Sequence, residues 1–180
     1  MPTMPTMPTM PVAYLDTVDS PAGPLAFAVD EEGALVRTQF VNGRYPMSIE
    51  EELLRAGYQL EHDAARTAPV REQLLEYHHG ARRTFDLPLA LGGTEWQRRV
   101  WLALGDVPFG QTLSYGALAA RLGRPQAARA VGHANGSNPL PLVVPCHRLI
   151  GANGALTGYG GGLDIKERLL AHEAQHSGPR

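Results

Sequence analysis

The only cysteine in this chain lies in the stretch VVPCHR, residues 143–148. A proline precedes Cys146, and His147 and Arg148 follow it. A free cysteine is often an inert core residue, so one interpretation is a small buried side chain beside a chance histidine. The other is a nucleophilic thiol, because the thiolate is the reactive form and an adjacent histidine can take up its proton. The hexapeptide alone leaves both interpretations open.

A histidine that acts as a base needs an acceptor that orients its ring. Glu173 could be this acceptor, because it ends a predicted helix, DIKERLLAHE (164–173); a solvated residue at a helix end is the alternative. The helix is expected to open on a capping box formed by Asp164 and Glu167. If the three groups act together, we expect a lowered pKa for Cys146 that depends on His147 and Glu173.

A pair of short helices precedes the cysteine and could position it against a polyanion. LSYGALAARLG (113–123) has Ser114 as N-cap and Gly123 as stop, and RPQAARAVGHANG (124–136) places Pro125 at a first helical position. A turn of about three residues between them suggests a helix-turn-helix, although an ordinary helical hairpin has the same spacing. Arg129 is the one long cation among small residues on the second helix, which favours phosphate contact over a core contact.

The remaining elements divide the chain into two parts. Strand-like runs at 13–18, 25–30 and 34–41, separated by turn residues, predict an antiparallel meander, and a helix is predicted over 69–80. The segment 86–96 forms the crossing, and TEWQRRVWLAL (94–104) is a helix capped by Thr94. We therefore expect a disordered Pro-Thr-Met tract at 1–11, one domain at 12–90 and a second at 91–176.

Composition excludes several classes of protein. The 180 residues are 43% hydrophobic and 19% charged, as in a globular protein, and no apolar run is long enough for a membrane span. One cysteine permits neither an intramolecular disulfide framework nor a thiolate-rich metal site, and it favours the reducing cytoplasm.

The charge is distributed unevenly along the chain. Residues 1–93 carry a net charge of −6 (7 Lys+Arg, 13 Asp+Glu) and residues 94–180 carry +4 (9 and 5). If a polyanion binds, we expect it on the C-terminal half.

Four stretches in this order, PFGQTLSYGALA, AARAVGHANGSNP, VVPCHRLIG and TGYGGGLDIKERLLAHE, resemble the alkylguanine-DNA alkyltransferases, also called methylated-DNA–protein-cysteine methyltransferases. The resemblance covers roughly residues 92–175. It implies an α+β protein in which an RNase H-like α/β domain precedes a mainly helical domain with a DNA-binding helix-turn-helix. It also implies a monomer without an obligate protein partner, cofactor or metal. Such a protein flips O6-alkylated guanine out of duplex DNA and transfers the alkyl group irreversibly to its own cysteine, once per molecule; O4-alkylated thymine is left open as a further substrate.

The resemblance also assigns roles to residues. Cys146 matches the alkyl acceptor, His147 its water-bridged base and Glu173 the orienting carboxylate, while Asn138 forms the turn into the active-site loop. Tyr115 matches the tyrosine that presses on the target phosphate, and it could also protonate the leaving base. Arg129 matches the side chain that fills the vacated stack. The implied DNA-binding residues are Tyr115, Gly116, Arg124, Ala128, Arg129 and Gly132, and the implied base-pocket residues are Pro141, Leu149, Tyr159 and Gly160.

One position departs from part of the family, and three other functions are compatible with some of these residues. Some members have a serine where this chain has Gly160, so a side-chain contact to the base from this position is in doubt. A cysteine hydrolase would need an oxyanion hole, for which no arrangement stands out. A lesion-binding module without chemistry would not need Cys146, and a helix-turn-helix regulator would use the first half as a sensor. Transfer of a labelled methyl group from DNA to protein separates these readings.

Overall fold

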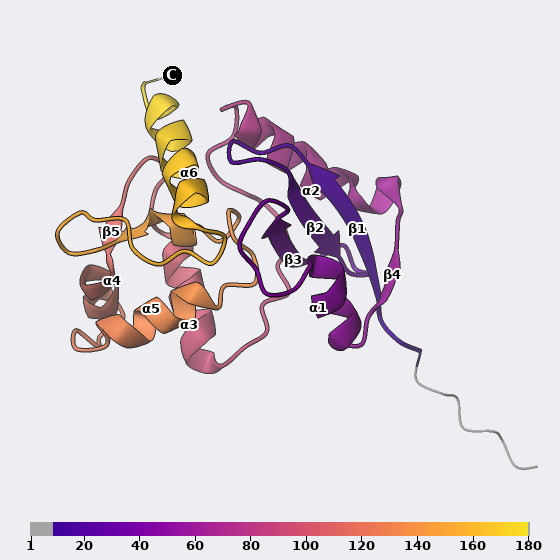
Figure 1. Ribbon diagram of the computed structural model, residues 1–180, viewed down its shortest axis with the longest axis horizontal. Helices are drawn as coiled ribbons and strands as arrows, with labels where there is room; N and C mark the ends of the chain where they lie inside the picture. Colours follow the sequence, from indigo (N-terminus) through magenta and orange to yellow (C-terminus); the bar gives the residue numbers. More distant parts are fainter. Residues whose placement is uncertain (1–8, 180) are drawn as a thin grey trace, which may run out of the picture.

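The computed structural model describes residues 9–179. The predicted disordered tract at 1–11 lies almost entirely outside the described residues. Figure 1 shows a sheet with two helices in the N-terminal half, and a set of helices in the C-terminal half. In chain order the elements are β1 (Val12–Val18), β2 (Leu25–Val29), β3 (Leu35–Phe40), α1 (Ile49–Arg55), β4 (Gln59–Glu61), α2 (Ala64–His78), α3 (Glu95–Gly105), β5 (Leu113–Ser114), α4 (Tyr115–Arg121), α5 (Ala128–Gly136), the 3-10 turn η1 (Cys146–Arg148), β6 (Leu149–Ile150) and α6 (Leu163–Gln175).

The N-terminal sheet has the order β3-β2-β1-β4. β1 pairs with β2 and β2 with β3, both antiparallel, which confirms the predicted meander. All five residues of β2 are buried, as expected for an inner strand. β4 adds a parallel partner on the other side of β1, which was not predicted because three residues carry too little periodicity.

Two helices of the N-terminal half differ from the prediction. α1 was missed, although Ser48 and Glu51 form a capping box that marks its start. α2 begins five residues before the predicted start at 69, because the Asp63 side chain accepts hydrogen bonds from the amides of Ala65 and Arg66. Pro69 consequently lies inside the helix rather than at its beginning.

The helices of the C-terminal half follow the prediction except at two N-termini. Thr94 and Ser114 cap α3 and α4 as predicted. α5 begins at Ala128 rather than beside Pro125, so the connection from α4 spans residues 122–127 and is about twice the predicted length. α6 lacks the predicted Asp164 cap: its N-cap is Gly162, whose φ of +109° favours glycine, and Asp164 lies in the first helical turn.

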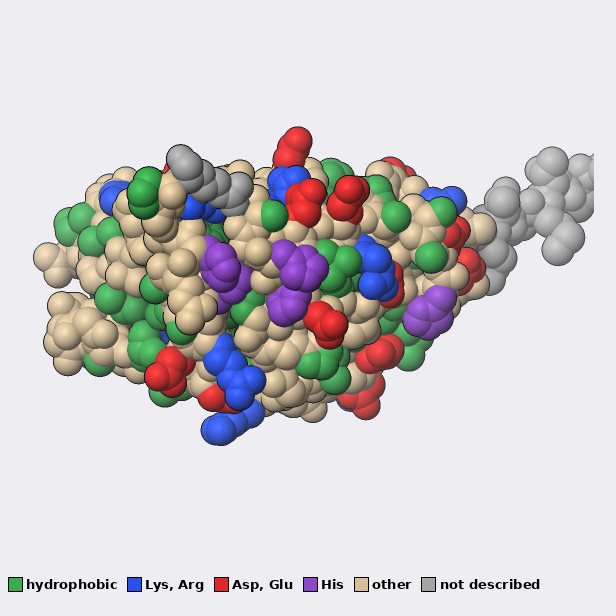
Figure 2. All heavy atoms as spheres, turned by 90° about the horizontal axis from the view of Figure 1, so that it is seen from above, with side chains coloured by type: hydrophobic (Ala, Val, Ile, Leu, Met, Phe, Trp, Pro, Cys, Tyr) green, Lys and Arg blue, Asp and Glu red, His purple; other side chains and the backbone are tan. Residues whose placement is uncertain are grey.

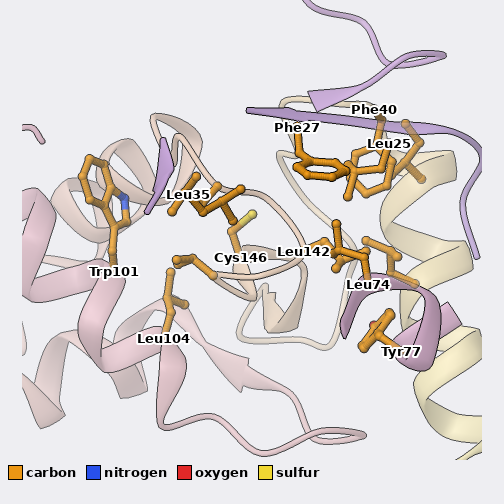
Figure 3. Packing of buried hydrophobic residues seen from close by; sticks show 14 of the residues in the cluster. Leu25, Phe27, Leu35, Phe40, Leu74, Tyr77, Trp101, Leu104, Leu142 and Cys146 are labelled. Atoms are coloured by element: carbon orange, nitrogen blue, oxygen red, sulfur yellow. The ribbon is translucent and has the colours of Figure 1, made fainter. Parts of the chain in front are cut away.

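The two halves share one core and meet along the edge strand β3. Thr38 donates from its amide to the carbonyl of Pro139 (3.1 Å) and from its hydroxyl to the carbonyl of Pro141 (2.8 Å). Leu35 exchanges backbone hydrogen bonds with the crossing segment near Leu89. A single cluster of buried side chains runs from the sheet to α6, and Figure 3 shows Cys146 among its members. The segment before Cys146 is thereby fixed to the N-terminal sheet.

The surface carries a group of histidines where α2 and α6 meet. The rings of His78 and His79 lie 5.1 Å apart and those of His172 and His176 4.4 Å apart, and Figure 2 shows histidine side chains gathered on the face seen from above. His172 Nε2 lies 2.8 Å from the carbonyl oxygen of Tyr77, so the ring joins the two helices. Within residues 9–179, no helix has the length and apolar character needed to cross a membrane.

Candidate active site

Cys146 begins the η1 turn and is 4% exposed. Asn138 shapes the segment that leads to it, because its amide nitrogen donates to the carbonyl of Val144 (2.9 Å) and its amide oxygen accepts from the amide of Leu140 (2.9 Å). Between these contacts Leu142 has a backbone φ of +78°, which residues other than glycine rarely adopt. The predicted role of Asn138 in the turn before the cysteine is consistent with this geometry.

His147 and Glu173 lie together in the interior, both without exposed surface. His147 Nε2 is 2.7 Å from Glu173 Oε1. Burial alone would raise the pKa of the Glu173 carboxyl, but the hydrogen bonds and charges of His147 and Arg148 hold it well below its usual range. An ionised carboxylate only accepts, so His147 must donate from Nε2, which leaves Nδ1 as a proton acceptor.

Glu173 receives several further donors. Arg148 donates from Nη2 to Oε1 (2.9 Å) and from Nε to Oε2 (3.0 Å), the amide of Gly110 donates to Oε2 (3.0 Å), and the hydroxyl of Tyr77 donates to Oε1 (2.8 Å). The carboxylate is therefore fixed from α2, from η1 and from the segment before β5. The sequence indicated neither Arg148 nor Tyr77 as a partner; a buried tyrosine hydroxyl needs one, but its identity depends on the tertiary fold.

The expected lowering of the Cys146 pKa is wrong for the free protein. Burial raises the pKa of the thiol, and the nearby Asn138 amide, Tyr159 hydroxyl and Lys166 ammonium offset this only in part. Burial also lowers the pKa of His147, despite the adjacent carboxylate. The resting site accordingly holds a neutral thiol and a neutral imidazole, so the proton must leave sulfur as the thiol attacks.

A small cavity of about 30 Å³ adjoins the thiol. The predicted pocket residues Pro141, Tyr159 and Gly160 line this cavity. Leu149 does not line it, because Leu149 is fully buried in β6, where its carbonyl accepts a hydrogen bond from Lys166 Nζ (2.5 Å). The lining also includes residues that the sequence did not indicate. The full lining is Tyr45, Asn135, Gly136, Asn138, Pro141, Cys146, Tyr159, Gly160 and Gly161.

Buried polar atoms without a partner gather around this cavity. Tyr45 Oη and Asn135 Oδ1, both from lining residues, have no hydrogen-bond partner among residues 9–179, and neither does Nδ1 of His147, the residue after the cysteine; the Tyr159 hydroxyl has only the weak Cys146 thiol as a partner. Most buried polar groups in folded proteins are hydrogen-bonded, so such a concentration marks a place where a ligand or water completes the bonding. The arrangement suits a polar ligand placed next to a nucleophile.

Tyr115 joins α4 to the glycine-rich loop 157–162. Its hydroxyl donates to the carbonyl of Thr157 (3.0 Å), and the ring lies 6.0 Å from Lys166 Nζ. Lys166 also donates to Thr157, at 2.9 Å, so two side chains hold the loop beside the cysteine. A Cβ on Gly132 would meet the Tyr115 ring at 3.7 Å, which places α5 directly against it.

The other predicted DNA-binding residues lie on or beside α4 and α5. Arg129 is exposed in the first turn of α5, next to the half-buried Ala128, and the half-buried Gly116 follows Tyr115. Arg124 lies between the two helices, with its guanidinium 5.0 Å from the centre of the Trp96 ring. In the part of the chain that the structure describes, no group of three or more His, Cys, Asp or Glu side chains could hold a metal ion.

Comparison with known proteins gives consistent matches over both halves. Residues 95–175 match the family "6-O-methylguanine DNA methyltransferase, DNA binding domain", and residues 13–91 match its "ribonuclease-like domain". The chain is 50% identical over 161 residues to a methylated-DNA–protein-cysteine methyltransferase of Mycolicibacterium paratuberculosis, covering 89% of this chain and 92% of that protein. A Salmonella typhimurium protein of the same name is 46% identical over 163 residues, with 88% and 94% covered.

Among solved structures, the chain is similar to Mycobacterium tuberculosis OGT in complex with DNA. The TM-score is 0.79 at 42% identity, and the match covers 91% of this chain and 94% of that one. A structure from Pyrococcus kodakaraensis, titled O6-methylguanine-DNA methyltransferase, has a TM-score of 0.61 at 22% identity and shares the fold. The predicted fold class, a ribonuclease-like sheet domain followed by a helical DNA-binding domain, is confirmed.

Proposed function

This chain belongs to the 6-O-methylguanine DNA methyltransferase family, and we propose from that premise that Cys146 takes the alkyl group from O6 of an alkylated guanine in duplex DNA. The protein is a DNA repair alkyltransferase that acts on its own cysteine. One observation supports the choice of residue more than any other. The only thiol of the chain borders a cavity and precedes a neutral histidine whose other nitrogen is fixed on a carboxylate.

The proposed reaction uses groups that the site already holds. Cys146 Sγ attacks the alkyl carbon, the S–C bond forms, and the bond from that carbon to O6 breaks. His147 Nδ1 accepts the thiol proton, through a water where the two do not touch, and the leaving guanine takes up a proton, for which the Tyr115 hydroxyl is the proposed donor. The product is a thioether, and none of these groups can reverse it, so each molecule reacts once.

We propose that α4 and α5 hold the DNA while the base leaves the stack. A base inside a duplex cannot present its O6 substituent to a thiol, so it must be rotated out. Arg129 is exposed and long enough to fill the vacated place, and Tyr115 lies where α4 begins, close to the loop beside the thiol. The small residues Gly116, Ala128 and Gly132 would permit close approach of the backbone, and Arg124 would contact phosphate.

The pocket for the flipped base is assigned to the cavity at Cys146. Pro141, Tyr159 and Gly160 would form its walls, and Leu149 would support them from the interior. We place the domain boundaries at 12–90 and 91–176, close to the family matches at 13–91 and 95–175. Double-stranded DNA with alkylated bases is the proposed partner, bound by a monomer without an obligate protein partner. A cytoplasmic location is proposed because the thiol must stay reduced.

A duplex with a labelled methyl group on guanine O6 tests the function. The label should move to the peptide that contains Cys146, with one methyl group per protein at excess DNA. Turnover beyond one equivalent would contradict a self-alkylating protein and favour a hydrolase. Binding to the duplex without any transfer would favour a lesion-binding module. A second duplex that carries O4-alkylthymine tests the other base: if the alkyl group stays on the thymine, O4-alkylthymine is not a substrate.

A further inference from the structure

The N-terminal domain reaches into the cavity at the thiol through Tyr45. Tyr45 lies in the segment 41–48 between β3 and α1, and it lines the cavity together with Cys146, Tyr159 and Gly160. The free space of about 30 Å³ corresponds to about one water molecule. A two-ring base is several times larger. The free volume beside the thiol is therefore small, so a group that enters it lies directly against the walls, and Tyr45 is one of them.

The segment that carries Tyr45 is attached to the glycine-rich loop. The amide of Arg44 donates to the carbonyl of Gly161 at 3.1 Å. A Cβ on Gly161 would lie 2.9 Å from the Tyr45 hydroxyl oxygen, which is closer than real Cβ atoms approach, and one on Gly160 would lie 3.7 Å from Tyr45 Cε1. The phenol can lie against the loop because residue 161 is a glycine. The Tyr45 ring also borders the space that a side chain at position 160 would fill.

The Tyr45 hydroxyl is buried without a hydrogen-bond partner among the described residues. Burial raises the pKa of Tyr45 to about 12, and the charge of a Cys146 thiolate adds to the effect, so the phenol stays neutral. A neutral donor held without an acceptor gains little from its present position. No side-chain hydrogen bond fixes the phenol, although the Phe40 backbone lies close enough to lower the pKa, so packing is the main restraint on this wall of the cavity.

On the basis of the proposed function, we infer that Tyr45 is a specificity-determining residue that limits the size of the alkyl group delivered to Cys146. The ring forms the movable wall of the cavity. When guanine enters, Tyr45 moves with the segment 41–48, and a larger O6 substituent demands a larger displacement. The substituent therefore packs against a side chain of the N-terminal domain, while the nucleophile belongs to the C-terminal domain.

Free alkylguanine bases test this inference without the need for base flipping. The rates of Cys146 alkylation by O6-methylguanine and O6-benzylguanine are measured for the parent, Tyr45→Ala and Tyr45→Phe. The benzyl-to-methyl ratio should rise about tenfold or more in Tyr45→Ala, because hydrophobic pockets discriminate substituents by such factors. Tyr45→Phe keeps the ring and should keep the ratio. The matched control is Tyr58→Ala, which should also keep the ratio. Tyr58 is half-buried and packs against a second, smaller cluster of buried side chains in the same domain, formed by Ala13, Leu15, Ala26, Ala28, Ile49 and Leu53.

A second readout requires neither DNA nor base. The rate of Cys146 modification by a bulky maleimide, relative to iodoacetamide, should rise in Tyr45→Ala and not in Tyr58→Ala. Thermal unfolding identifies variants that fail to fold, and Tyr45→Leu then replaces Tyr45→Ala with a smaller loss of volume. An unchanged benzyl-to-methyl ratio in folded Tyr45→Ala, or in Tyr45→Leu where it replaces that variant, overturns the inference. Failure of the parent to take a methyl group from O6-methylguanine DNA would instead overturn the proposed function.

Discussion

The two domains contribute to the site in different ways. The C-terminal domain supplies charged and reactive groups: the thiol, the imidazole, and a carboxylate that is ionised because an arginine and an imidazole donate to it. The N-terminal domain supplies two neutral phenols, Tyr45 at the cavity and Tyr77 at the carboxylate. Reactivity therefore belongs to one domain, whereas the shape of the pocket and the position of the relay depend on both.

The largest expected effect is that of Cys146→Ser. Transfer of a labelled methyl group from duplex DNA should fall to background, because a neutral hydroxyl is a far weaker nucleophile than a thiolate. Affinity for unmodified duplex should be retained, since phosphate contacts do not involve the thiol. Label on the serine variant would show that the reacting atom lies elsewhere. The assignment of the reactive groups to the C-terminal domain would then be wrong.

Glu173→Gln should have the next largest effect, on stability. It leaves Arg148 buried without its carboxylate, and breaking one partner of a buried ion pair costs about 3–5 kcal/mol. Denaturant unfolding measures this, with the exposed Glu167→Gln on the same helix as a control that should change by less than about 0.5 kcal/mol.

The same variant has a signature in acid. Because the pKa of Glu173 is lowered in the folded state, its contribution to stability is present above the usual carboxyl pKa and is lost as the pH falls. The free energy of unfolding of the parent should therefore decline more steeply in acid than that of Glu173→Gln. Parallel pH profiles would mean that the carboxyl is not selectively stabilised by folding.

Arg129→Ala should separate DNA handling from chemistry within the C-terminal domain. Unstacking a base costs a few kcal/mol, so loss of about 1–2 kcal/mol of compensation slows duplex repair roughly tenfold. Reaction with free alkylguanine needs no flipping and should stay unchanged, as should both rates in the exposed Arg168→Ala control.

Tyr115→Phe should slow transfer from both the duplex and the free base if the Tyr115 hydroxyl protonates the leaving base. An effect on the duplex alone would restrict Tyr115 to flipping.

The buried thiol should show slow, pH-dependent alkylation in the absence of DNA. Only the thiolate reacts, and burial raises the pKa of Cys146, so the rate with iodoacetamide should still rise about tenfold per pH unit near pH 8.5, where free cysteine begins to level off. A plateau reached below pH 8 would indicate that His147 and Glu173 lower the thiol pKa after all.

The smallest expected effect is that of Tyr77→Phe. It removes one of several hydrogen bonds to the ionised Glu173 carboxylate, and such a bond is worth about 1.5–3 kcal/mol of stability. Methyl transfer should slow by less than about fivefold, because His147 and Arg148 still fix the carboxylate. A loss as large as that of Glu173→Gln would show that the N-terminal domain forms part of the relay itself.

Sequence reasoning identified the parts of the site that are local or share a motif. Cys146 and His147 are adjacent, Asn138 begins the segment that ends at the cysteine, and Glu173 was named from helix position and resemblance. Tyr45 and Tyr77 reach the site across about a hundred residues of chain, and no periodicity encodes such a contact. Tyr77 lies in the predicted helix 69–80, but nothing in that pattern indicates that its hydroxyl donates to Glu173.

The errors have a common origin in tertiary context. The thiol pKa was expected to fall because a histidine is adjacent in sequence, whereas in the fold burial outweighs that neighbour. Pro125 and Asp164 each fit a helix-start pattern, yet α5 starts at Ala128, and Gly162 with its positive φ begins α6. Local patterns located these helices correctly and misplaced their ends, where side chains and turns compete for the same backbone groups.

The way in which β3 is covered has a consequence for solubility during synthesis. An open strand edge is a template for pairing with other chains, and here the segment 139–141 covers it with the carbonyls of two prolines. Because proline has no amide proton, Pro139 and Pro141 accept hydrogen bonds from Thr38 but offer no N–H groups with which a further strand could pair. The sheet therefore ends there. The crossing segment near Leu89 already pairs with Leu35, but a nascent chain that has emerged only as far as the first domain leaves the Thr38 end of this edge open, so we expect the second domain to lower the tendency to aggregate.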